Sequence, residues 1–408
     1  MRDEHQSKQN QVLFALLRES LTEDAVPCGD VAAGEGHNCD YARLIDQATK
    51  HGVLPLICDP LERLPVPEDL LQQARKRAQM TVRQNYRLLF LSRYLLAELH
   101  KRQIPTVLLK GMGTASYYPV PELRKSGDVD LLLLDPERVQ EAGECLKALG
   151  CTVEEWQPAL HHVVFGYQAG ERRIEIELHT MLAEPFDDAR INQLLTRQVP
   201  QLPPHVVQAE TIGVTLPVLD TAYHAYELLL HMLQHFLRAG FGLKLLCDWV
   251  VFWNRGADET QKTLYLALVR EAGIKKFSDL VTLACVDNLG LRPEAVAFME
   301  PDQTLSADAF MAEIMEAEEF GKSSRDRMVA LRGSGVTDYV REFHHQMHLN
   351  YPKAGKVWLL WPVLWCLTLG RFLINNHTVR KTSLSAILKK AGQRGDLMKK
   401  LELFREER

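Results

Sequence analysis

The chain has 408 residues and a formal net charge of −5, and 46% of its residues are hydrophobic and 25% charged. These values predict a globular protein with two or three packed units, and the total charge gives no indication of nucleic-acid binding. None of the eight cysteines forms a Cys-x-x-Cys pair, which argues against a zinc or redox site of that type. Reduced cysteines and a polar N-terminus without an apolar signal core predict a cytoplasmic protein.

The first hundred residues are predicted to be helical. Apolar residues recur with helical spacing over residues 12–21 and 41–51, and a longer segment over 70–100 contains neither glycine nor proline. A polar stretch at 29–38 predicts a loop. Together these segments predict an N-terminal helical region over residues 1–102.

Residues 103–200 show a different pattern, in which short apolar runs alternate with helical segments. The predicted strands are 106–109, 129–134, 151–156, 163–167 and 173–178, with a turn and short helix at 111–118 and a helix at 136–149. This order predicts an α+β fold, in which a small mixed sheet is flanked by N-terminal and C-terminal helical regions.

Helical periodicity returns at Thr221, most clearly over residues 223–237 and 243–253. The region 201–340 is therefore predicted to be a helical domain. Its hydrophilic part from residue 302 onward is expected to be exposed helix and loop.

The last region, 341–408, contains an almost wholly apolar segment at 357–370. Trp358, Trp361 and Trp365 lie on one stripe of the predicted helix, and a tail rich in lysine and arginine follows. The segment is shorter than the ~20 residues that cross a bilayer. Two hypotheses remain, a buried core helix, which we favour, and an interfacial helix that makes peripheral membrane contact through residues 357–408.

The chemistry is expected at Asp128 and Asp130, which begin the second predicted strand. Side chains two apart on a strand point to the same face, so the two carboxylates repel each other unless a cation lies between them. Mg²⁺ binds such oxygen ligands and shares them with substrate phosphates, and Mn²⁺ is an alternative. The Lys110-Gly111 turn upstream provides a cation and a close backbone approach for those phosphates.

A third carboxylate is predicted on the strand at 173–178. Glu175, Glu177 and His179 alternate with aliphatic residues and therefore share one face. Glu177 is the preferred third acid and Glu175 the reserve. Three carboxylates and two Mg²⁺ ions would stabilise the attacking and leaving oxygens of a phosphoryl displacement, so nucleotidyl transfer from a nucleoside triphosphate fits this arrangement.

The chain resembles the bacterial uncharacterised nucleotidyltransferase family, within the DNA polymerase β-like nucleotidyltransferase superfamily. The resemblance spans residues 42–248 and rests on Leu109-Lys-Gly111, the block 124–132 and Glu177-Leu-His179, with His231 and Asp248 as weaker markers. It implies that Asp128, Asp130 and Glu177 bind metal and catalyse transfer.

The resemblance further implies a set of residues that bind the triphosphate. These are Lys110, Gly111, Gly113, Thr114, Arg124, Ser126 and Gly127. The chain departs from the superfamily at Met112, where a small residue is usual, so Gly113 and Thr114 are expected to supply backbone amides instead. Glycine at 127 permits close approach beside Asp128.

Other polar residues have alternative explanations. His231 and His235, and likewise His344 and His348, lie four apart on predicted helices, but neither pair has the further ligands of a zinc site. His161 and His162 precede a strand, and they are further candidates for contact with the substrate. Asp248 lies in an apolar helix, where a buried carboxylate needs a partner, by default an arginine or lysine.

The sequence predicts an enzyme that uses a nucleoside triphosphate and an acceptor hydroxyl or phosphate, with release of pyrophosphate. The acceptor, the base preference and the oligomeric state are not readable from the sequence. The alternative hypothesis is a non-catalytic nucleotide sensor or scaffold in a biosynthetic assembly. The complete set of acids argues against that alternative, because a scaffold gains nothing from clustering carboxylates that repel each other.

Overall fold

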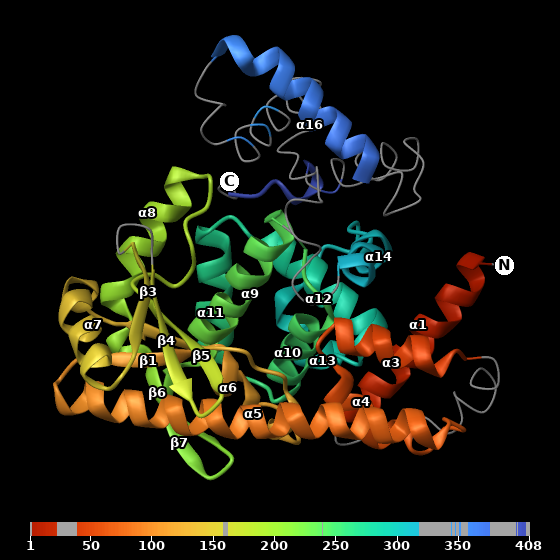
Figure 1. Ribbon diagram of the computed structural model, residues 1–408, viewed down its shortest axis with the longest axis horizontal. Coiled ribbons are helices and arrows are strands. Elements are labelled where there is room, and N and C mark those ends of the chain that lie inside the picture. The colour runs from red at the N-terminus through yellow and green to blue at the C-terminus, as the bar shows by residue number, and fades with distance from the viewer. Residues whose placement is uncertain are drawn as a thin grey trace.

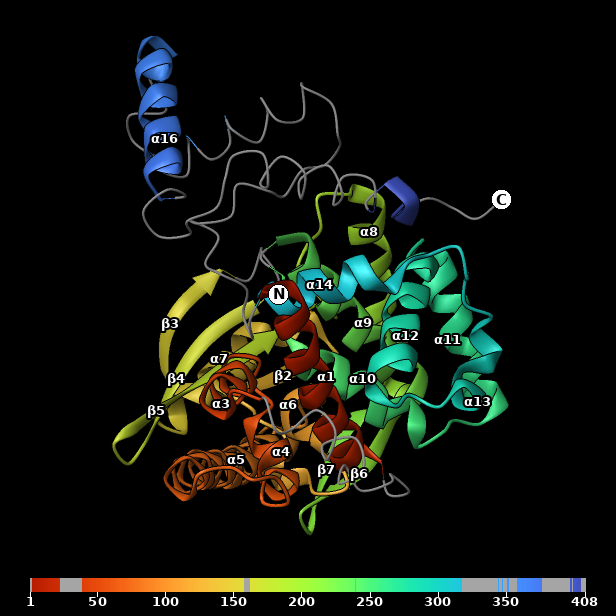
Figure 2. The same cartoon turned by 90° about the vertical axis from the view of Figure 1, so that its right-hand side faces the viewer.

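The computed structural model describes residues 2–22, 39–157, 162–238, 240–317 and 358–375, together with 344, 347, 351, 397 and 399–404. Its strands form a mixed sheet in the order β3-β4-β5-β2-β1-β7-β6 (Figures 1 and 2). They are β1 (Thr106–Leu109), β2 (Val129–Leu133), β3 (Thr152–Gln157), β4 (His162–Ala169), β5 (Arg172–His179), β6 (Val206–Thr211) and β7 (Val214–Leu219). β2 is parallel to β5 and β1 is parallel to β7, and the other neighbours are antiparallel.

Helices precede and follow the sheet in the chain, as the sequence predicts. Those before β7 are α1 (Arg2–Leu21), α3 (Tyr41–Lys50), α4 (Leu54–Leu61), α5 (Glu68–Lys101), α6 (Gly111–Ala115), α7 (Val139–Ala148) and α8 (Ala189–Gln198). Those after it are α9 (Thr221–Arg238), α10 (Leu243–Asn254), α11 (Glu259–Glu271), α12 (Lys275–Leu289), α13 (Pro293–Val296), α14 (Ala307–Ala317) and α16 (Trp361–Asn375). The predicted α+β architecture is confirmed, and so are all five predicted strands.

The hairpin of β6 and β7 was not predicted. It lies at the start of the region 201–340, where only helices were expected, and it adds two strands to the sheet beside β1. Its turn residues, Ile212 and Gly213, both have positive φ, as a two-residue hairpin requires. A β-branched residue such as Ile212 rarely adopts this conformation. Because Ile212-Gly213 stands in place of the usual Asn-Gly or Asp-Gly, no sequence signal indicates this hairpin.

The two faces of the sheet are buried in two different hydrophobic clusters. On β1, Leu108 packs into the cluster formed with α5 and α7, whereas Val107 and Leu109 pack into the larger cluster formed with α9 and α10. The larger cluster also includes α1, α4 and α12, so the N-terminal helices share a core with the helices that follow β7. Helix α5 runs along one edge of the molecule, past both the sheet and the N-terminal helices (Figure 1).

The apolar segment near the C-terminus is not a core helix. Trp358 is 69% exposed and Val363 is 59% exposed, and both views show α16 away from the sheet and its covering helices (Figures 1 and 2). The favoured core hypothesis is therefore wrong for this exposed face, although Leu364 and Thr368 of the same helix are buried. Among the described residues, no helix has the length and hydropathy needed to cross a membrane. Membrane contact by this segment stays a prediction.

Candidate active site

The acidic residues of the site converge because β2 and β5 are adjacent, parallel and in register. Asp130 is paired with Glu177, and Leu132 with His179. The aliphatic residues between them, such as Ile176 and Leu178, are buried in the cluster with α5. The polar face of β5 therefore points to the opposite side of the sheet, toward α9. The predicted alternation is confirmed, and along this face burial increases from the exposed Glu175 through the half-buried Glu177 to the buried His179.

Asp130, Glu177 and His179 form a compact cluster of ligand atoms. One ligand atom from each residue lies within 4.8 Å of the others, which is close enough for a common metal ion. His179 Nε2 lies 2.9 Å from Asp130 Oδ1 and 3.1 Å from Glu177 Oε2. Sequence reasoning selected the two carboxylates of this cluster and left out the histidine, although it lies on the same face of the strand.

Burial and hydrogen bonding act in opposite directions on these three groups. Burial alone would raise the pKa of Asp130, but Lys110 and His179 hold it well below its ordinary value. Burial would likewise raise the pKa of Glu177, and the hydrogen bond from His179 lowers it instead. Burial would lower the pKa of His179, whereas its bonds to the two carboxylates raise it to about 9. The cluster therefore contains two carboxylates and a protonated imidazole at neutral pH.

Asp128 lies just before β2 and stands apart from this cluster. Repulsion by Asp130, together with burial, raises its pKa to about 6. Lys110 and Lys244 lower that value in part, so both lysines lie near the same carboxyl group. The structure thus brings Asp128 close to Asp130, as predicted, but it places His179 rather than Asp128 among the three converging ligand atoms.

Lys110 connects the predicted phosphate-binding turn with the acids. Its Nζ lies 3.1 Å from Asp130 Oδ1, and the side chain is largely buried. Burial would lower the pKa of Lys110, but Asp130, Glu227, Glu177 and Asp128 together raise it. Its backbone has φ +40°, an uncommon conformation for a residue with a side chain, and such strain is often found at functional sites.

The turn after Lys110 does not offer the expected amides. The backbone N–H groups of Gly113 and Thr114 both donate to Lys110 O, at 2.9 and 3.2 Å. The Thr114 side chain is buried, and its Oγ1 lies 3.1 Å from His224 Nε2. These two residues therefore maintain the shape of α6. The backbone of Gly111 has φ +47° and turns the chain beside Asp128.

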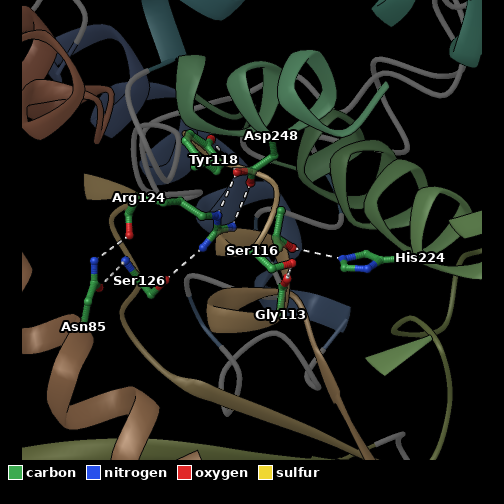
Figure 3. Close-up of polar contacts among 9 residues, drawn as sticks. Asn85, Gly113, Ser116, Tyr118, Arg124, Ser126, His224 and Asp248 are labelled. Carbon is green, nitrogen blue, oxygen red and sulfur yellow. Dashed lines mark hydrogen bonds and ion pairs between the residues drawn. The ribbon is translucent and has the colours of Figure 1, made fainter. Parts of the chain in front are cut away.

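Arg124 has a protein partner where the family resemblance implied a phosphate. Its Nε and Nη2 donate to Asp248 Oδ1 and Oδ2 at 2.7 and 2.8 Å, and Tyr118 Oη donates to Oδ1 at 2.7 Å (Figure 3). Nη1 also donates to Ser126 Oγ at 2.9 Å. The expectation that Asp248 has a basic partner in the core is confirmed. Arg124 and Ser126 accordingly support the loop before Asp128, and a phosphate contact would compete with these bonds.

Asn85 on α5 holds the same loop from the other side. Its amide donates to Glu122 O at 2.6 Å and to Arg124 O at 2.7 Å, and its oxygen accepts from Ser126 N at 3.3 Å. Figure 3 shows Asn85 and Asp248 on opposite sides of this segment. Gly127 follows it, and a Cβ atom there would meet nothing within 4 Å, so the chain beside Asp128 is open to a ligand.

Helix α9 supplies polar residues that sequence reasoning missed or left open. Glu227 is buried, and burial raises its pKa to about 8 although Lys110 lowers it. His231 and His235 follow at four-residue intervals on the same stripe, and burial and Lys110 lower the pKa of both. The regular spacing 227, 231, 235 was visible in the sequence. That this stripe lies opposite Lys110 depends on how α9 packs on the sheet.

The structure also gives the surroundings of the paired histidines. Within the described part of the chain, Asp130, Glu177 and His179 are the only residues grouped closely enough to hold a metal ion, so His231 and His235 complete no second site. His344 accepts a hydrogen bond from Trp365 Nε1 at 3.2 Å. His348 and His161 lie outside the described residues. The ring of His162 lies near that of His179, with centroids 5.7 Å apart and the ring planes tilted by 43°.

Comparison with known families agrees with the acidic cluster. Residues 37–290, more than half of the chain, match the model of a family described as uncharacterised nucleotidyltransferases. The chain belongs to this uncharacterised nucleotidyltransferase family. The stretch that matches the family contains the whole cluster of Asp130, Glu177 and His179, as well as Lys110 and Asp248. Membership supports nucleotidyltransferase as the enzyme class.

Other comparisons add little to the family assignment. One solved structure, an antigenic nucleotidyltransferase-like protein from Paracoccidioides brasiliensis, is similar over 53% of this chain and 93% of its own, with 13% identity and a TM-score of 0.33. A TM-score this low carries no argument. No curated protein matches the chain. The wider resemblance to the DNA polymerase β-like superfamily stays a prediction.

Proposed function

We propose that this member of the nucleotidyltransferase family transfers a nucleoside monophosphate from a nucleoside triphosphate to an acceptor hydroxyl or phosphate and releases pyrophosphate. The observation that carries the proposal is the convergence of Asp130, Glu177 and His179 from neighbouring strands, within 4.8 Å of one another. Two carboxylates held together in a buried setting are costly unless a cation neutralises them. Lys110 and His179 supply positive charge in the structure, and a divalent ion would supply more.

The donor set fits Mg²⁺ or Mn²⁺. Carboxylate oxygens are ligands for both ions, and His179 would become a ligand, better suited to Mn²⁺ than to Mg²⁺, on losing its proton. Asp130 and Glu177 would hold the first ion, and Asp128 lies close enough to Asp130 to contribute to a second. When bound, the ions would stabilise negative charge on the attacking and leaving oxygens.

The chain's own residues would position the reactants and move one proton. Lys110 would neutralise the phosphates, since its ammonium lies beside the acids at the start of the turn. The proton of the acceptor hydroxyl would pass to a carboxylate oxygen. Without the ions, repulsion by Asp130 and burial raise the pKa of Asp128 to about 6, whereas that of Glu177 is lowered, so Asp128 is the better base when it does not hold the second ion.

Transfer from an α-³²P-labelled triphosphate into a cell extract tests the proposal, with mass spectrometry of the labelled product. We expect Asp128→Asn and Asp130→Asn each to abolish labelling, and EDTA to do the same until Mg²⁺ or Mn²⁺ is added. The matched control is Glu171→Gln, an exposed carboxylate in the β4–β5 turn, which should keep full activity. Full activity in both aspartate variants would eliminate the mechanism. Triphosphate binding without transfer to any acceptor would instead support the nucleotide-sensor hypothesis.

A further inference from the structure

The outer face of α5 exposes a continuous stripe of aromatic and cationic side chains. Tyr86, Phe90 and Tyr94 are 37%, 56% and 43% exposed. The stripe also contains three exposed arginines, Arg83, Arg87 and Arg93. At 100° per residue, all six side chains fall within an arc of about 120°. An exposed aromatic patch of this kind usually marks an interaction site.

The arginines of this stripe are available to an anion. Within the described part of the chain, neither a salt bridge nor a side-chain hydrogen bond engages Arg83, Arg87 or Arg93. The stripe also adjoins the loop that leads to Asp128, since Tyr86 Oη donates to Glu122 Oε1 at 3.2 Å. An anionic partner on α5 would therefore lie beside the segment that carries the candidate active site.

The order of residues around the helix argues against a membrane surface. An interfacial helix separates an apolar face from a basic face. Here Arg83 lies at about 60° around the axis, between Phe90 at about 40° and Tyr94 at about 80°. Pairing with a second copy of the same face would bring these arginines against each other, which costs free energy through like-charge repulsion. The alternation of aromatic and cationic side chains around the helix suits a partner that itself alternates flat rings with negative charges.

The spacing of the rings supports the same partner. The Tyr86 and Phe90 ring centroids lie 6.5 Å apart, with only 25° between the ring planes. The two rings therefore have similar orientations, and both side chains are exposed. Bases stack on exposed aromatic side chains while arginines bind the phosphates between them.

We propose that this face of α5 binds single-stranded nucleic acid, with bases stacked on Tyr86, Phe90 and Tyr94 and phosphates on the three arginines. The net charge of the chain gives no indication of such binding, because the three arginines of this helix face are a small part of the 48 lysines and arginines in the total. The inference does not depend on nucleotidyl transfer and holds for a catalytic or a non-catalytic chain.

Fluorescence anisotropy with a 5′-labelled 20-nucleotide uridylate tests the proposal on the full chain. We expect saturable binding with a Kd of roughly 10⁻⁶–10⁻⁴ M near physiological salt, and a slope of log K against log salt of about −2 for three phosphate contacts. Phe90→Ala should weaken binding about tenfold through loss of stacking. Arg87→Gln should reduce the salt slope by about 0.7, the value for one contact on a single strand.

Two surface variants serve as matched controls. Val207→Ala removes an exposed apolar side chain from β6, and Arg197→Gln removes an exposed arginine from α8, and both should bind like the original chain. The proposal is overturned if binding does not reach half-saturation by about 10⁻⁴ M protein, the upper limit of the expected Kd range. It is equally overturned if Phe90→Ala binds as tightly as the original chain. The proposal is also overturned if RNA does not bind but the chain binds phosphatidylserine vesicles or dimerises in sedimentation, and Phe90→Ala abolishes that interaction. The surface would then be assigned to a membrane or to a second copy of the chain.

Discussion

The buried ion pair between Arg124 and Asp248 gives a prediction that depends directly on the structure. The two side chains are 4% and 1% exposed, and Asp248 accepts three hydrogen bonds of 2.7–2.8 Å from Arg124 and Tyr118. The substitution Asp248→Asn keeps the shape of the side chain but removes its charge. The guanidinium of Arg124 is then left buried without a counter-charge.

We expect Asp248→Asn to lower the free energy of unfolding by about 3–5 kcal/mol, the cost of removing one partner of a buried pair. The hydrogen bonds support this size, since each bond to a charged group contributes about 1.5–3 kcal/mol and the new amide oxygen can still accept some of them. Urea unfolding, followed by tryptophan fluorescence and circular dichroism, measures the loss. A loss below about 1 kcal/mol, the level of an exposed pair, would refute the reasoning.

Two further variants separate charge from packing. Asp287→Asn, at an exposed position on α12, should change the free energy of unfolding by no more than about 0.5 kcal/mol. The double variant Arg124→Met with Asp248→Leu replaces the pair by apolar groups, which is often neutral, and leaves the Tyr118 hydroxyl without its acceptor and Ser126 Oγ without the donor Arg124 Nη1. Its loss should therefore be about 1–3 kcal/mol, smaller than that of Asp248→Asn. A double variant less stable than Asp248→Asn would show that side-chain packing, rather than the unpaired charge, sets the cost.

Three more predictions follow from the site. Glu177→Gln should weaken Mn²⁺ binding, measured by calorimetry, by at least about tenfold. Glu175 is exposed, so Glu175→Gln should leave the affinity within twofold, and equal losses in the two variants would contradict the choice of third acid. The pKa of Glu227 is raised from its ordinary value of 4.5 to about 8. Between these two pH values the folded state binds more protons than the unfolded state, so this group makes the free energy of unfolding fall as the pH rises toward 8. Glu227→Gln removes this effect, so its stability relative to the original chain should increase from pH 5 to pH 8, by up to about 1.4 kcal/mol per pH unit, and a constant difference across that range would disprove the assignment. Gly111→Ala should cost about 1–2 kcal/mol because the residue has φ +47°, whereas Gly127→Ala, with open space around it, should be neutral in thermal unfolding.

The α+β fold could be predicted because its signals are local. Alternation of polar and aliphatic residues on β5 and the long periodic run of α5 each follow from the spacing of neighbouring residues. The hairpin of β6 and β7 was missed because its local signal is absent, since Ile212-Gly213 is an unusual turn sequence. The exposure of Trp358 was also missed, because composition does not show whether a partner surface is present.

The candidate site could be predicted in part. Asp128, Asp130 and Glu177 were identified from the sequence, and the structure places Asp130 beside Glu177 because β2 and β5 pair in register. His179 was not chosen, although it alternates with the same aliphatic residues. Arg124 was expected at a phosphate, but its partner Asp248 is 124 positions away and no local pattern indicates that they meet.

The sequence by itself therefore determined which side chains share one face of a strand or helix, since backbone geometry repeats every two residues in strands and about every 3.6 in helices. Tertiary structure alone decided which faces meet. It placed β5 beside β2, brought Glu227 of α9 near Lys110 and Asp130, and left the aromatic and arginine stripe of α5 exposed. Such contacts join residues far apart in the chain, and they depend on the order of the strands and the packing of helices rather than on neighbouring residues.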